Sequence, residues 1–447
     1  MPGISVSKIC VPFGGGGIDW SSYWATRKPS DLIVTGMRDT EIDFSWTDNS
    51  AGDCSFAIYR STDGVNYSSV GTTVAGDTTY TATGLTAGTL YYFYVVGVKS
   101  GNESDPTNIY DTRFKITIDT TKAGSASNTF VLPNYASGTY DYYVDWGEGG
   151  AEEHITTTGT HSHTYAASGT YQIKIRGTMP RIYFNLTGDR LKVMNIDNWG
   201  NLAWSSMVNA FNGCSAMQGR YIDCPNLSAV TNMSYMFASC TVFNQSVANF
   251  NTAEVTDMSY MFYGCTAFNQ SVANFNTAKV TNMSHMFTNC TAFKQSLATF
   301  SLASATNLTN MLNGCDLNTA GTTTNYDATL VAWAAADVPN SLSFHGGNSK
   351  YGEGLVDSGT TDGVAANKLI QSGQNFLTTV TIGDVIYNTT DGTYARVTAI
   401  DSDTQLSIDA DIMASGEAYR IQHGDGAEAR ASLILDDLWT ITDGGYL

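Results

Sequence analysis

Alternating hydrophobic and polar positions dominate the first part of the chain and predict short β-strands. The alternating hydrophobic residues are Ile42, Phe44, Trp46, Phe56 and Ile58. A period of two residues is expected of strands that bury one face. Asp63-Gly64, which follows these runs, is typical of a hairpin turn. The pattern predicts a small β-sandwich over residues 31–113.

A second pattern, a repeat of 25 residues, lies within residues 181–354. Val230–Glu254 reads VTNMSYMFASCTVFNQSVANFNTAE, Val255–Lys279 reads VTDMSYMFYGCTAFNQSVANFNTAK, and a third copy begins at Val280. The residues that share a register and should form the core are Met233, Met258, Met283, Phe237, Phe262, Phe287, Phe250, Phe275, Phe300, Cys240, Cys265, Cys290 and Cys315. One repeat cannot bury its apolar face alone, so we expect stacked repeats with one continuous core. The cysteines should be buried free thiols, with redox or metal roles as weaker alternatives.

Composition and charge narrow the function classes. Only 14% of the 447 residues are charged, and the net charge is −19. A chain this acidic repels phosphate backbones, which argues against nucleic-acid binding. No apolar run approaches the roughly 20 residues of a membrane-spanning helix. The abundant glycine and tyrosine favour a mainly β, multidomain fold: β-sandwich modules followed by a repeat solenoid.

Residues 31–113 resemble a fibronectin type III domain. The segment Gly84–Val98 reads GLTAGTLYYFYVVGV, in which Leu85 and Tyr91 match the tyrosine corner of that family, and Trp46 matches its core tryptophan. The resemblance implies a structural role for Trp46 and Tyr91. No RGD-type integrin motif is present, so that ligand is not implied.

Residues 114–180 resemble a PKD-type sandwich. The supporting segments are YVDWGEG, from Tyr143, and HTYAASGTYQIKI, from His163. The family usually has Asp where this chain has Glu148, and the resemblance implies that Trp146 and Tyr165 are core residues. His161 and His163 form an H-x-H pair that could bind a metal, although a surface role is the simpler interpretation.

The recurring VTxMSxMFxxCxxFNQ block resembles BspA-like leucine-rich repeat surface proteins. That family implies a curved solenoid over residues 181–354, with one short strand and one helical turn per repeat, and a role in adhesion. Its arrays run from GNSKY directly into an Ala-rich helix and a WTITDGG ending. Here GNSKY ends at Tyr351, whereas the ending lies in Ala427–Gly445.

The residues between these halves, 355–423, are therefore interpreted as an inserted small β-domain. Residues 424–447 would be the capping helix and C-terminus, with the helix over Glu428–Leu438. The strand-like runs of the insertion are Thr378–Ile382, Val385–Tyr387, Tyr394–Ile400 and Gln405–Ile408. Four aspartates in this region, Asp401, Asp403, Asp409 and Asp411, could bind calcium, but solvated turn carboxylates are the simpler reading.

No motif predicts catalysis. The chain lacks a G-x-S-x-G elbow, an H-E-x-x-H helix and a P-loop. We therefore assign no catalytic, cofactor-binding or metal residues and expect no cofactor and no enzyme activity. Matching Asn-Gln pairs at Asn244 and Asn269 could recognise sugars or could satisfy the backbone of the array.

The combination of modules predicts a surface protein, although the N-terminal residues do not read as a signal peptide. Residues 1–30 resemble the N-termini of phage structural proteins. We expect a non-enzymatic virion surface protein, as a tail-fibre, head-fibre or decoration component. Residues 1–30 would anchor it to other virion proteins, and the outer modules would contact a host glycan or protein receptor. The alternatives are a bacterial cell-surface adhesin and, less favoured, a polysaccharide depolymerase. Homo-oligomer formation is left open.

Overall fold

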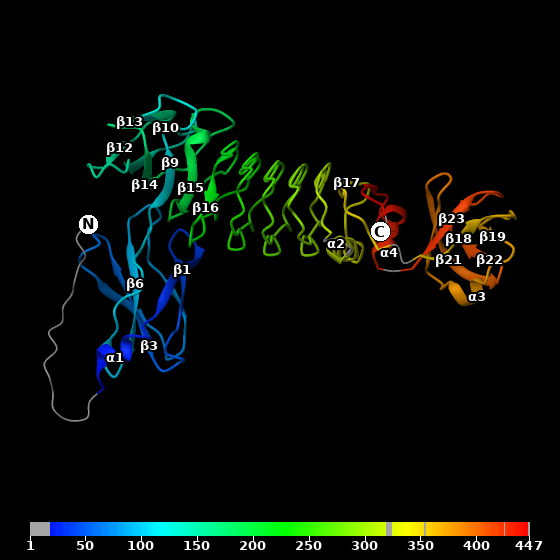
Figure 1. The fold of residues 1–447 in the computed structure, drawn as a ribbon, viewed down its shortest axis with the longest axis horizontal. Coiled ribbons are helices and arrows are strands. Elements are labelled where there is room, and N and C mark those ends of the chain that lie inside the picture. The colour runs from blue at the N-terminus through cyan, green and yellow to red at the C-terminus, as the bar shows by residue number, and fades with distance from the viewer. Residues whose placement is uncertain (1–17, 319–323, 353–354, 424, 446–447) are drawn as a thin grey trace. The chain divides into compact units, whose positions relative to one another are not determined.

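The computed structural model describes residues 18–318, 324–352, 355–423 and 425–445 (Figure 1). The chain divides into two compact units. Of the described residues, the first comprises those up to Asp111 except for the short segments 36–40 and 85–89, and the second comprises those segments and the described residues from Thr112 onward. Strands far outnumber helices among the described residues, and the protein is a mainly β, multidomain chain.

The first module is a sandwich of two antiparallel sheets. Its elements are α1 (Trp20–Trp24), β1 (Ser30–Met37), β2 (Ile42–Thr47), β3 (Ser55–Ser61), β4 (Ser68–Thr72), β5 (Thr79–Ala82), β6 (Tyr92–Lys99), β7 (Asn102–Glu103) and β8 (Tyr110–Asp111). One sheet has the order β1-β2-β5 and the other β4-β3-β6-β7, with β8 also paired to β6. Trp46 on β2 meets Phe56 on β3 edge-to-face at 5.4 Å, which joins the two sheets through the core.

Part of the predicted anchoring arm belongs to this first module. The Trp24 side chain of α1 is buried, and its ring lies so close to Gly97 on β6 that a side chain there would clash. The Tyr23 hydroxyl donates a hydrogen bond to Asp53 at 2.6 Å. Residues 1–17, the remainder of the predicted arm, lie outside the described residues.

The second module begins at Thr112 and contains a large sheet. Its strands are β9 (Phe114–Asp119), β10 (Thr129–Pro133), β11 (Asp141–Asp145), β12 (Glu153–Ile155), β13 (Thr160–Thr164), β14 (Thr170–Thr178), β15 (Val193–Asn198) and β16 (Gln218–Gly219), and η1 (Arg190–Lys192) precedes β15. The six-stranded order is β12-β11-β14-β9-β15-β16, while β10 and β13 pair separately. Because β9 pairs with β15, this sheet continues past residue 180 and shares its core with the repeats that follow.

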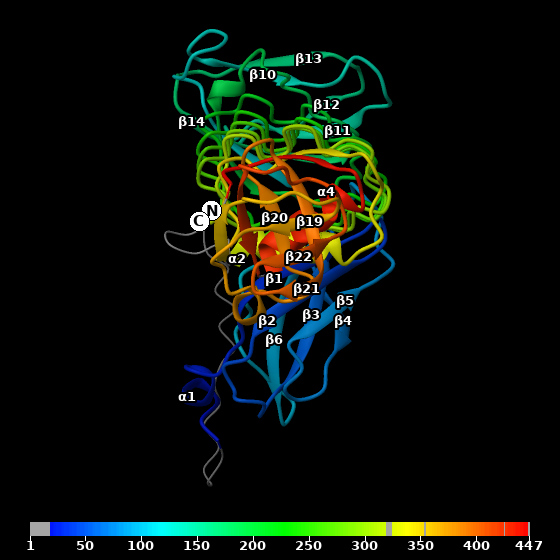
Figure 2. The ribbon, with the colours of Figure 1, turned by 90° about the vertical axis from the view of Figure 1, so that its right-hand side faces the viewer.

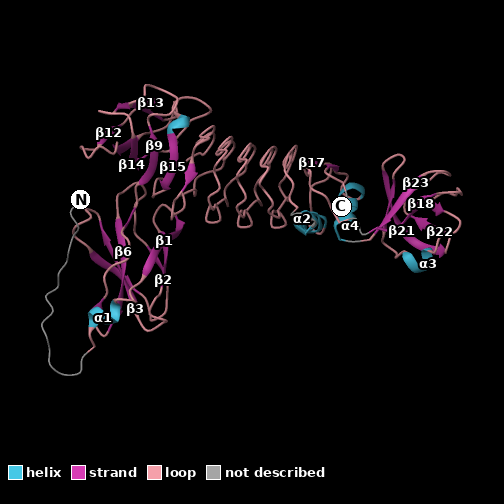
Figure 3. Cartoon of the chain, viewed as in Figure 1, coloured by secondary structure: helices cyan, strands magenta, loops and turns pink. Residues whose placement is uncertain are grey.

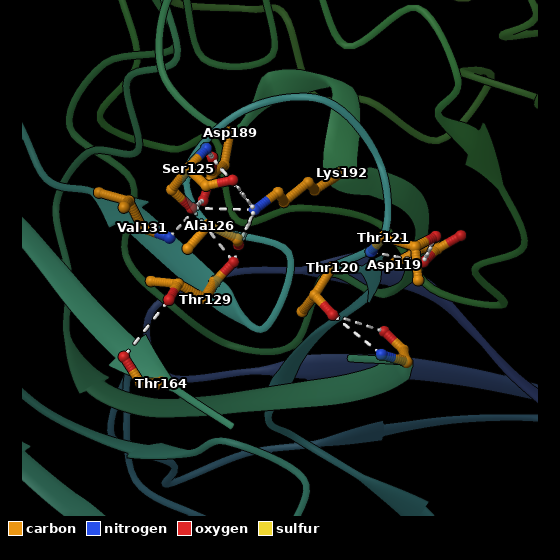
Figure 4. Close-up of polar contacts among 11 residues, drawn as sticks. Asp119, Thr120, Thr121, Ser125, Ala126, Thr129, Val131, Thr164, Asp189 and Lys192 are labelled. Atoms are coloured by element: carbon orange, nitrogen blue, oxygen red, sulfur yellow. Dashed lines mark hydrogen bonds and ion pairs between the residues drawn. The ribbon is translucent and has the colours of Figure 1, made fainter. Parts of the chain in front are cut away.

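A buried ion pair fastens the loop before β10 to η1 (Figure 4). Lys192 and Asp189 lie 3.6 Å apart, and both side chains are fully buried. The Lys192 ammonium donates to the carbonyl oxygens of Ser125, Ala126 and Thr129 at 3.1, 2.9 and 2.7 Å. The Asp189 carboxylate accepts from the backbone N–H groups of Ser125 and Val131 at 2.6 and 2.7 Å. Each charge thus has both a counter-charge and hydrogen-bond partners, which is what a buried ion pair requires.

The repeat array (residues 205–318) is built by backbone hydrogen bonds from one repeat to the next. The N–H groups of Met233, Tyr235 and Phe237 donate to the carbonyl oxygens 24 residues later in the chain, at 2.9, 3.0 and 2.9 Å. Met258, Tyr260 and Phe262 repeat these bonds to the following copy. Figure 1 shows successive repeats side by side, and Figure 2, which looks along the array, shows them superimposed.

The secondary structure of the repeats differs from the prediction of one short strand and one helical turn each. Within the described residues 220–318, the array consists of turns joined by single parallel bridges, and Figure 3 draws it as loop. The bridges link Asn232, Asp257, Asn282 and Asn307. The prediction was wrong because residues with positive φ interrupt each turn, so neither a strand nor a helix can propagate.

The end of the array joins the two separated halves of the expected cap. Its elements are α2 (Thr324–Ala334), β17 (Ser343–His345), α4 (Asp425–Leu435) and β24 (Thr440–Thr442). Strands β17 and β24 pair in parallel, and the Tyr351 N–H donates to the Gly445 carbonyl at 3.0 Å. Trp333 of α2, Phe344 of β17 and Trp439 pack together beneath these elements.

The residues between the halves form a β-domain with its own core. Its elements are β18 (Leu355–Thr360), β19 (Lys368–Ile370), α3 (Phe376–Thr379), β20 (Val385–Asn388), β21 (Thr393–Ser402), β22 (Gln405–Ile408) and β23 (Ala418–Gln422). The sheet order is β18-β23-β20-β21-β22-β19. The predicted strand Thr378–Ile382 is wrong: α3 and a turn occupy it, because buried Phe376 anchors a helical turn and Asp384 accepts the Thr381 N–H at 2.8 Å.

In the part of the chain that the structure describes, no helix combines the length and the apolar character needed to cross a membrane.

Candidate functional site

Each repeat of the array contains two residues with a left-handed backbone conformation. One position holds Gly213, Ser239, Gly264, Asn289 and Gly314, with φ between 59° and 84°. The other holds Asn209, Tyr235, Tyr260, His285 and Asn310, with φ between 54° and 59°. Glycine and asparagine are the residues that tolerate this conformation best. The first position follows this preference almost throughout, whereas the second departs from it in the three central repeats.

Tyr235, Tyr260 and His285, which we call the aromatic row, stack on one another along the array. The ring centroids of Tyr235 and Tyr260 are 4.4 Å apart with planes 6° apart, and those of Tyr260 and His285 are 4.4 Å apart at 12°. Tyr263 joins the row at 5.6 Å from Tyr260. All four side chains are half-buried, so each presents part of its ring to solvent.

The backbone at the aromatic row carries a conformational cost that asparagine would reduce. A left-handed conformation costs an ordinary residue roughly 1–2 kcal/mol. The repeats on either side of the row have asparagine at this position, Asn209 and Asn310, and asparagine adopts the left-handed conformation at a lower cost. Strained residues of this kind cluster at binding and catalytic sites, where the side chain is required for its own chemistry. The aromatic row is therefore the candidate recognition surface of the repeat array.

The electrostatics of the row are those of an uncharged surface. Burial raises the pKa of Tyr235, with a further contribution from neighbouring Tyr260, so its hydroxyl stays protonated. Burial lowers the pKa of His285 below its ordinary value of 6.5, which favours the neutral imidazole. The His285 Nδ1 faces the Thr288 hydroxyl at 3.3 Å and its Nε2 faces Asn310 at 3.5 Å. The row can offer neutral hydroxyl, imidazole and amide groups beside aromatic edges.

The residues predicted as the repeat core lie behind this surface. All thirteen, which comprise the in-register methionines, phenylalanines and cysteines, are at most 3% exposed. Phe237 and Phe262 stack at 5.8 Å, and Phe262 and Phe287 at 5.6 Å. The thiols of Cys265 and Cys290 donate to backbone carbonyls of the preceding repeat at 2.9 and 2.8 Å.

The described cysteines are free and buried. Burial raises the pKa of the Cys214, Cys240, Cys265 and Cys290 thiols, so these groups stay protonated and unreactive. They serve as small packing groups with one donated hydrogen bond.

The paired amides of the array are engaged in holding repeats together. The Asn244 side-chain oxygen accepts the Asn269 N–H at 2.9 Å and the Gln270 amide at 3.0 Å. Asn269 makes the same two bonds to Lys294 and Gln295, at 2.9 and 3.0 Å. The amide oxygens therefore satisfy backbone groups, as the structural alternative expects.

The sandwich residues singled out by sequence lie in the module cores. Trp46, Tyr91, Trp146 and Tyr165 are each less than 9% exposed. The Tyr165 hydroxyl donates to the Trp146 carbonyl at 3.1 Å, which ties the core to the turn after β11.

The structure does not bring His161 and His163 together on one ligand. His163 stacks on the Trp146 ring at 4.8 Å, and its Nε2 contacts Glu148 at 2.9 Å. The Nε2 of His161 instead contacts the Thr157 carbonyl at 3.1 Å.

Three of the four aspartates considered for calcium have separate side-chain partners, and Asp403 accepts the Phe376 N–H through its backbone carbonyl at 3.1 Å. Asp401 pairs with Lys368 at 2.7 Å, Asp409 accepts the Arg396 N–H at 2.7 Å, and Asp411 accepts the Asn367 N–H at 3.0 Å. No metal-ligand cluster that includes these aspartates occurs among the described residues.

Sequence reasoning missed the aromatic row. Tyr235, Tyr260 and His285 share a 25-residue register that was visible in the repeats. The signal that distinguishes them is the replacement, in the three central repeats, of the asparagine found at this position in the repeats on either side. This replacement indicates a functional position only when the backbone there is known to be left-handed.

Comparison with known families assigns two parts of the chain. Residues 27–113 match the model of the fibronectin type III domain. This segment is a fibronectin type III domain. Residues 205–340 match the family described as Mycoplasma protein of unknown function, DUF285. Both kinds of module are typical of surface and adhesion proteins. A search of curated proteins finds no match to this chain.

Two solved structures that match part of this chain are described as fibronectin-type proteins. A Fn3-like protein from Clostridium thermocellum is 27% identical and covers 20% of this chain and 91% of its own, with a TM-score of 0.18. A segment of two fibronectin type III domains from chicken tenascin is 17% identical and covers 34% and 92%, with a TM-score of 0.19. TM-scores this low say nothing about the fold of the whole chain.

Proposed function

We propose that this protein is a non-enzymatic structural and adhesion protein whose repeat array recognises a glycan or protein on a host surface. The observation that carries the proposal is the aromatic row, which keeps three ring-bearing residues at a strained backbone position where the flanking repeats use asparagine. The fibronectin type III and DUF285 modules support the same class of function.

The chemistry of the row favours a neutral ligand. Between Trp204 and Cys315 the chain has three basic and three acidic residues, so the array is not a strongly charged surface. Aromatic rings and neutral hydroxyl and amide groups are the side chains that bind sugars and uncharged polar peptide segments through ring contacts and hydrogen bonds. We favour a surface glycan as the ligand, with a protein receptor as the second candidate.

The test compares the wild-type chain with Y235N/Y260N/H285N on a glycan array and on candidate host cells. Asparagine is compatible with the backbone at these positions, so the variant should fold. We expect it to lose binding by at least about tenfold, the effect of losing one to two kcal/mol of contact. The matched control is S239N/G264N, which changes the other left-handed position of two repeats and should leave binding unchanged. Equal binding by both variants would exclude the row as the recognition surface.

We further propose that the protein is displayed on a phage particle, as a tail-fibre, head-fibre or decoration component anchored through its N-terminal region. The support is the association of adhesion modules with an N-terminal segment that resembles those of phage structural proteins. Virions purified through washing should retain the chain, and its absence from washed particles would overturn this assignment. A bacterial cell-surface adhesin is the alternative, and it would instead be found in the cell envelope fraction.

We also propose that the array is a BspA-like leucine-rich-repeat-type solenoid. The support is the in-register hydrogen bonding of repeats 25 residues long and the shared core of their methionines, phenylalanines and cysteines. An experimental structure of the array would test this assignment through the path of each repeat.

A further inference from the structure

Three potential metal ligands meet where the inserted β-domain joins the capping helix. Asp384 lies in the turn before β20, His423 follows β23, and Glu428 lies on α4. The His423 Nδ1 is 2.6 Å from the Asp384 Oδ1 and 3.9 Å from the Glu428 Oε1. The three ligand atoms lie within 4.8 Å of one another. Residues 39 positions apart in the chain are thus brought to one point.

The carboxylates of Asp384 and Glu428 are not paired with a lysine or arginine side chain among the described residues. The Asp384 side chain is 1% exposed, and its second oxygen accepts the Thr381 N–H at 2.8 Å. A buried carboxylate is costly unless a positive charge accompanies it. This differs from Asp189, which the buried Lys192 neutralises.

We propose that Asp384, His423 and Glu428 form a binding site for a first-row divalent cation, of which Zn²⁺ is the natural probe. Imidazole nitrogen and carboxylate oxygen are both ligand atoms that Zn²⁺ accepts in proteins. Calcium prefers six to eight oxygen ligands, which this cluster does not provide. Metal–ligand bonds of about 2.1 Å place tetrahedral ligand atoms about 3.4 Å apart, between the shortest and longest spacings of the cluster. The proposal is independent of the recognition function of the array.

The bound ion would link the inserted domain to the cap. Two ligands belong to the inserted domain and the third to the helix that covers the end of the array. The ion would therefore restrict the junction through which the domain is inserted. The described helix α4 should exchange its amide hydrogens more slowly when the site is filled.

The experiment uses the full chain, stripped with a chelator and titrated with ZnCl₂ by calorimetry near neutral pH. We expect saturable binding, loss of at least about tenfold in affinity in H423Q and in E428Q, and slower exchange in α4 on addition of Zn²⁺. Both side chains are substantially exposed, at 55% and 40%, so these variants should fold. Asp384 is left unchanged because it is buried, and its substitution would itself destabilise the fold.

The matched control is H154Q. His154 contacts Asp141 at 2.6 Å, as His423 contacts Asp384, but both partners are exposed and belong to no ligand cluster among the described residues. Its substitution should leave Zn²⁺ affinity within about twofold of wild type. Absence of saturable binding would overturn the proposal. Binding that survives in H423Q and E428Q would also overturn it, and a thiolate charge-transfer band with Co²⁺ would then assign the metal to a cysteine.

Discussion

Replacing Tyr260 by asparagine tests whether the aromatic row is kept for recognition or for packing. Tyr260 stacks on Tyr235 and on His285, each at 4.4 Å. Each aromatic pair is worth about 0.5–1.5 kcal/mol, so removal of the ring should cost about 1–3 kcal/mol. Asparagine should recover about 1 kcal/mol of this because it tolerates the left-handed backbone at φ 57°. We therefore expect a net destabilisation of about 0–2 kcal/mol.

Hydrogen exchange is the appropriate assay, since a multidomain chain does not unfold in a single two-state transition. Amides of the repeat around Tyr260 report its local opening free energy. Phe262→Ala, which removes a fully buried ring of the same repeat, should cost about 3–5 kcal/mol and gives the scale of a core substitution. Ser239→Asn occupies the other left-handed position, and it should stabilise the repeat by up to about 1 kcal/mol.

The reasoning would be refuted by a Tyr260→Asn variant that loses as much stability as Phe262→Ala. In that case the ring would be retained for packing, and the strained backbone would give no information about a ligand. A Ser239→Asn variant without any gain would show that the cost of the left-handed conformation is absorbed elsewhere in the repeat.

Three further predictions concern other parts of the chain. Lys192→Met should destabilise the second module by about 3–5 kcal/mol, because Asp189 would remain buried without its counter-charge. Hydrogen exchange of the β9 and β14 amides measures this loss, and a fall of less than about 1 kcal/mol in their opening free energy would contradict the prediction. Burial lowers the pKa of His285 in the folded chain, so the unfolded chain binds more protons and the stability of the array should fall as the pH drops below 6.5. Local opening free energies of the array amides, measured by hydrogen exchange from about pH 7.5 to 5, should show this dependence, and His285→Asn should reduce it. The thiols of Cys265 and Cys290 should resist a thiol reagent until denaturant is added, and rapid labelling of the native chain would be inconsistent with their burial.

Much of the architecture follows from periodicity, because identical repeats must bury identical positions. The 25-residue register located Phe262 and Cys265 in the core, and the alternation around Phe44 located a strand of the fibronectin type III domain. The prediction of a strand at Thr378–Ile382 was wrong because β-branched residues favour strands only where they can pack in a sheet. There the burial of Phe376 decides the local structure.

The candidate sites depend on information that the sequence does not express locally. A left-handed backbone at Tyr260 leaves no glycine or asparagine signal at that residue. The cluster at His423 requires Asp384, 39 residues earlier, to be brought back by the sheet order β23-β20. Both features are set by tertiary contacts rather than by neighbours in the chain.

The pairing of β17 with β24 has a consequence for the order in which the chain can fold. The strand that covers β17 and closes the end of the array, β24, lies almost 100 residues later in the sequence, beyond the entire inserted domain. During synthesis the apolar end around Phe344 therefore has Trp333 beside it but lacks the contact with Trp439 until the inserted domain has left the ribosome. The inserted domain, which has a core of its own, can fold in this interval. Completion of the array thus follows synthesis of the inserted domain, and a chain interrupted within the insertion would leave part of this hydrophobic end exposed to aggregation.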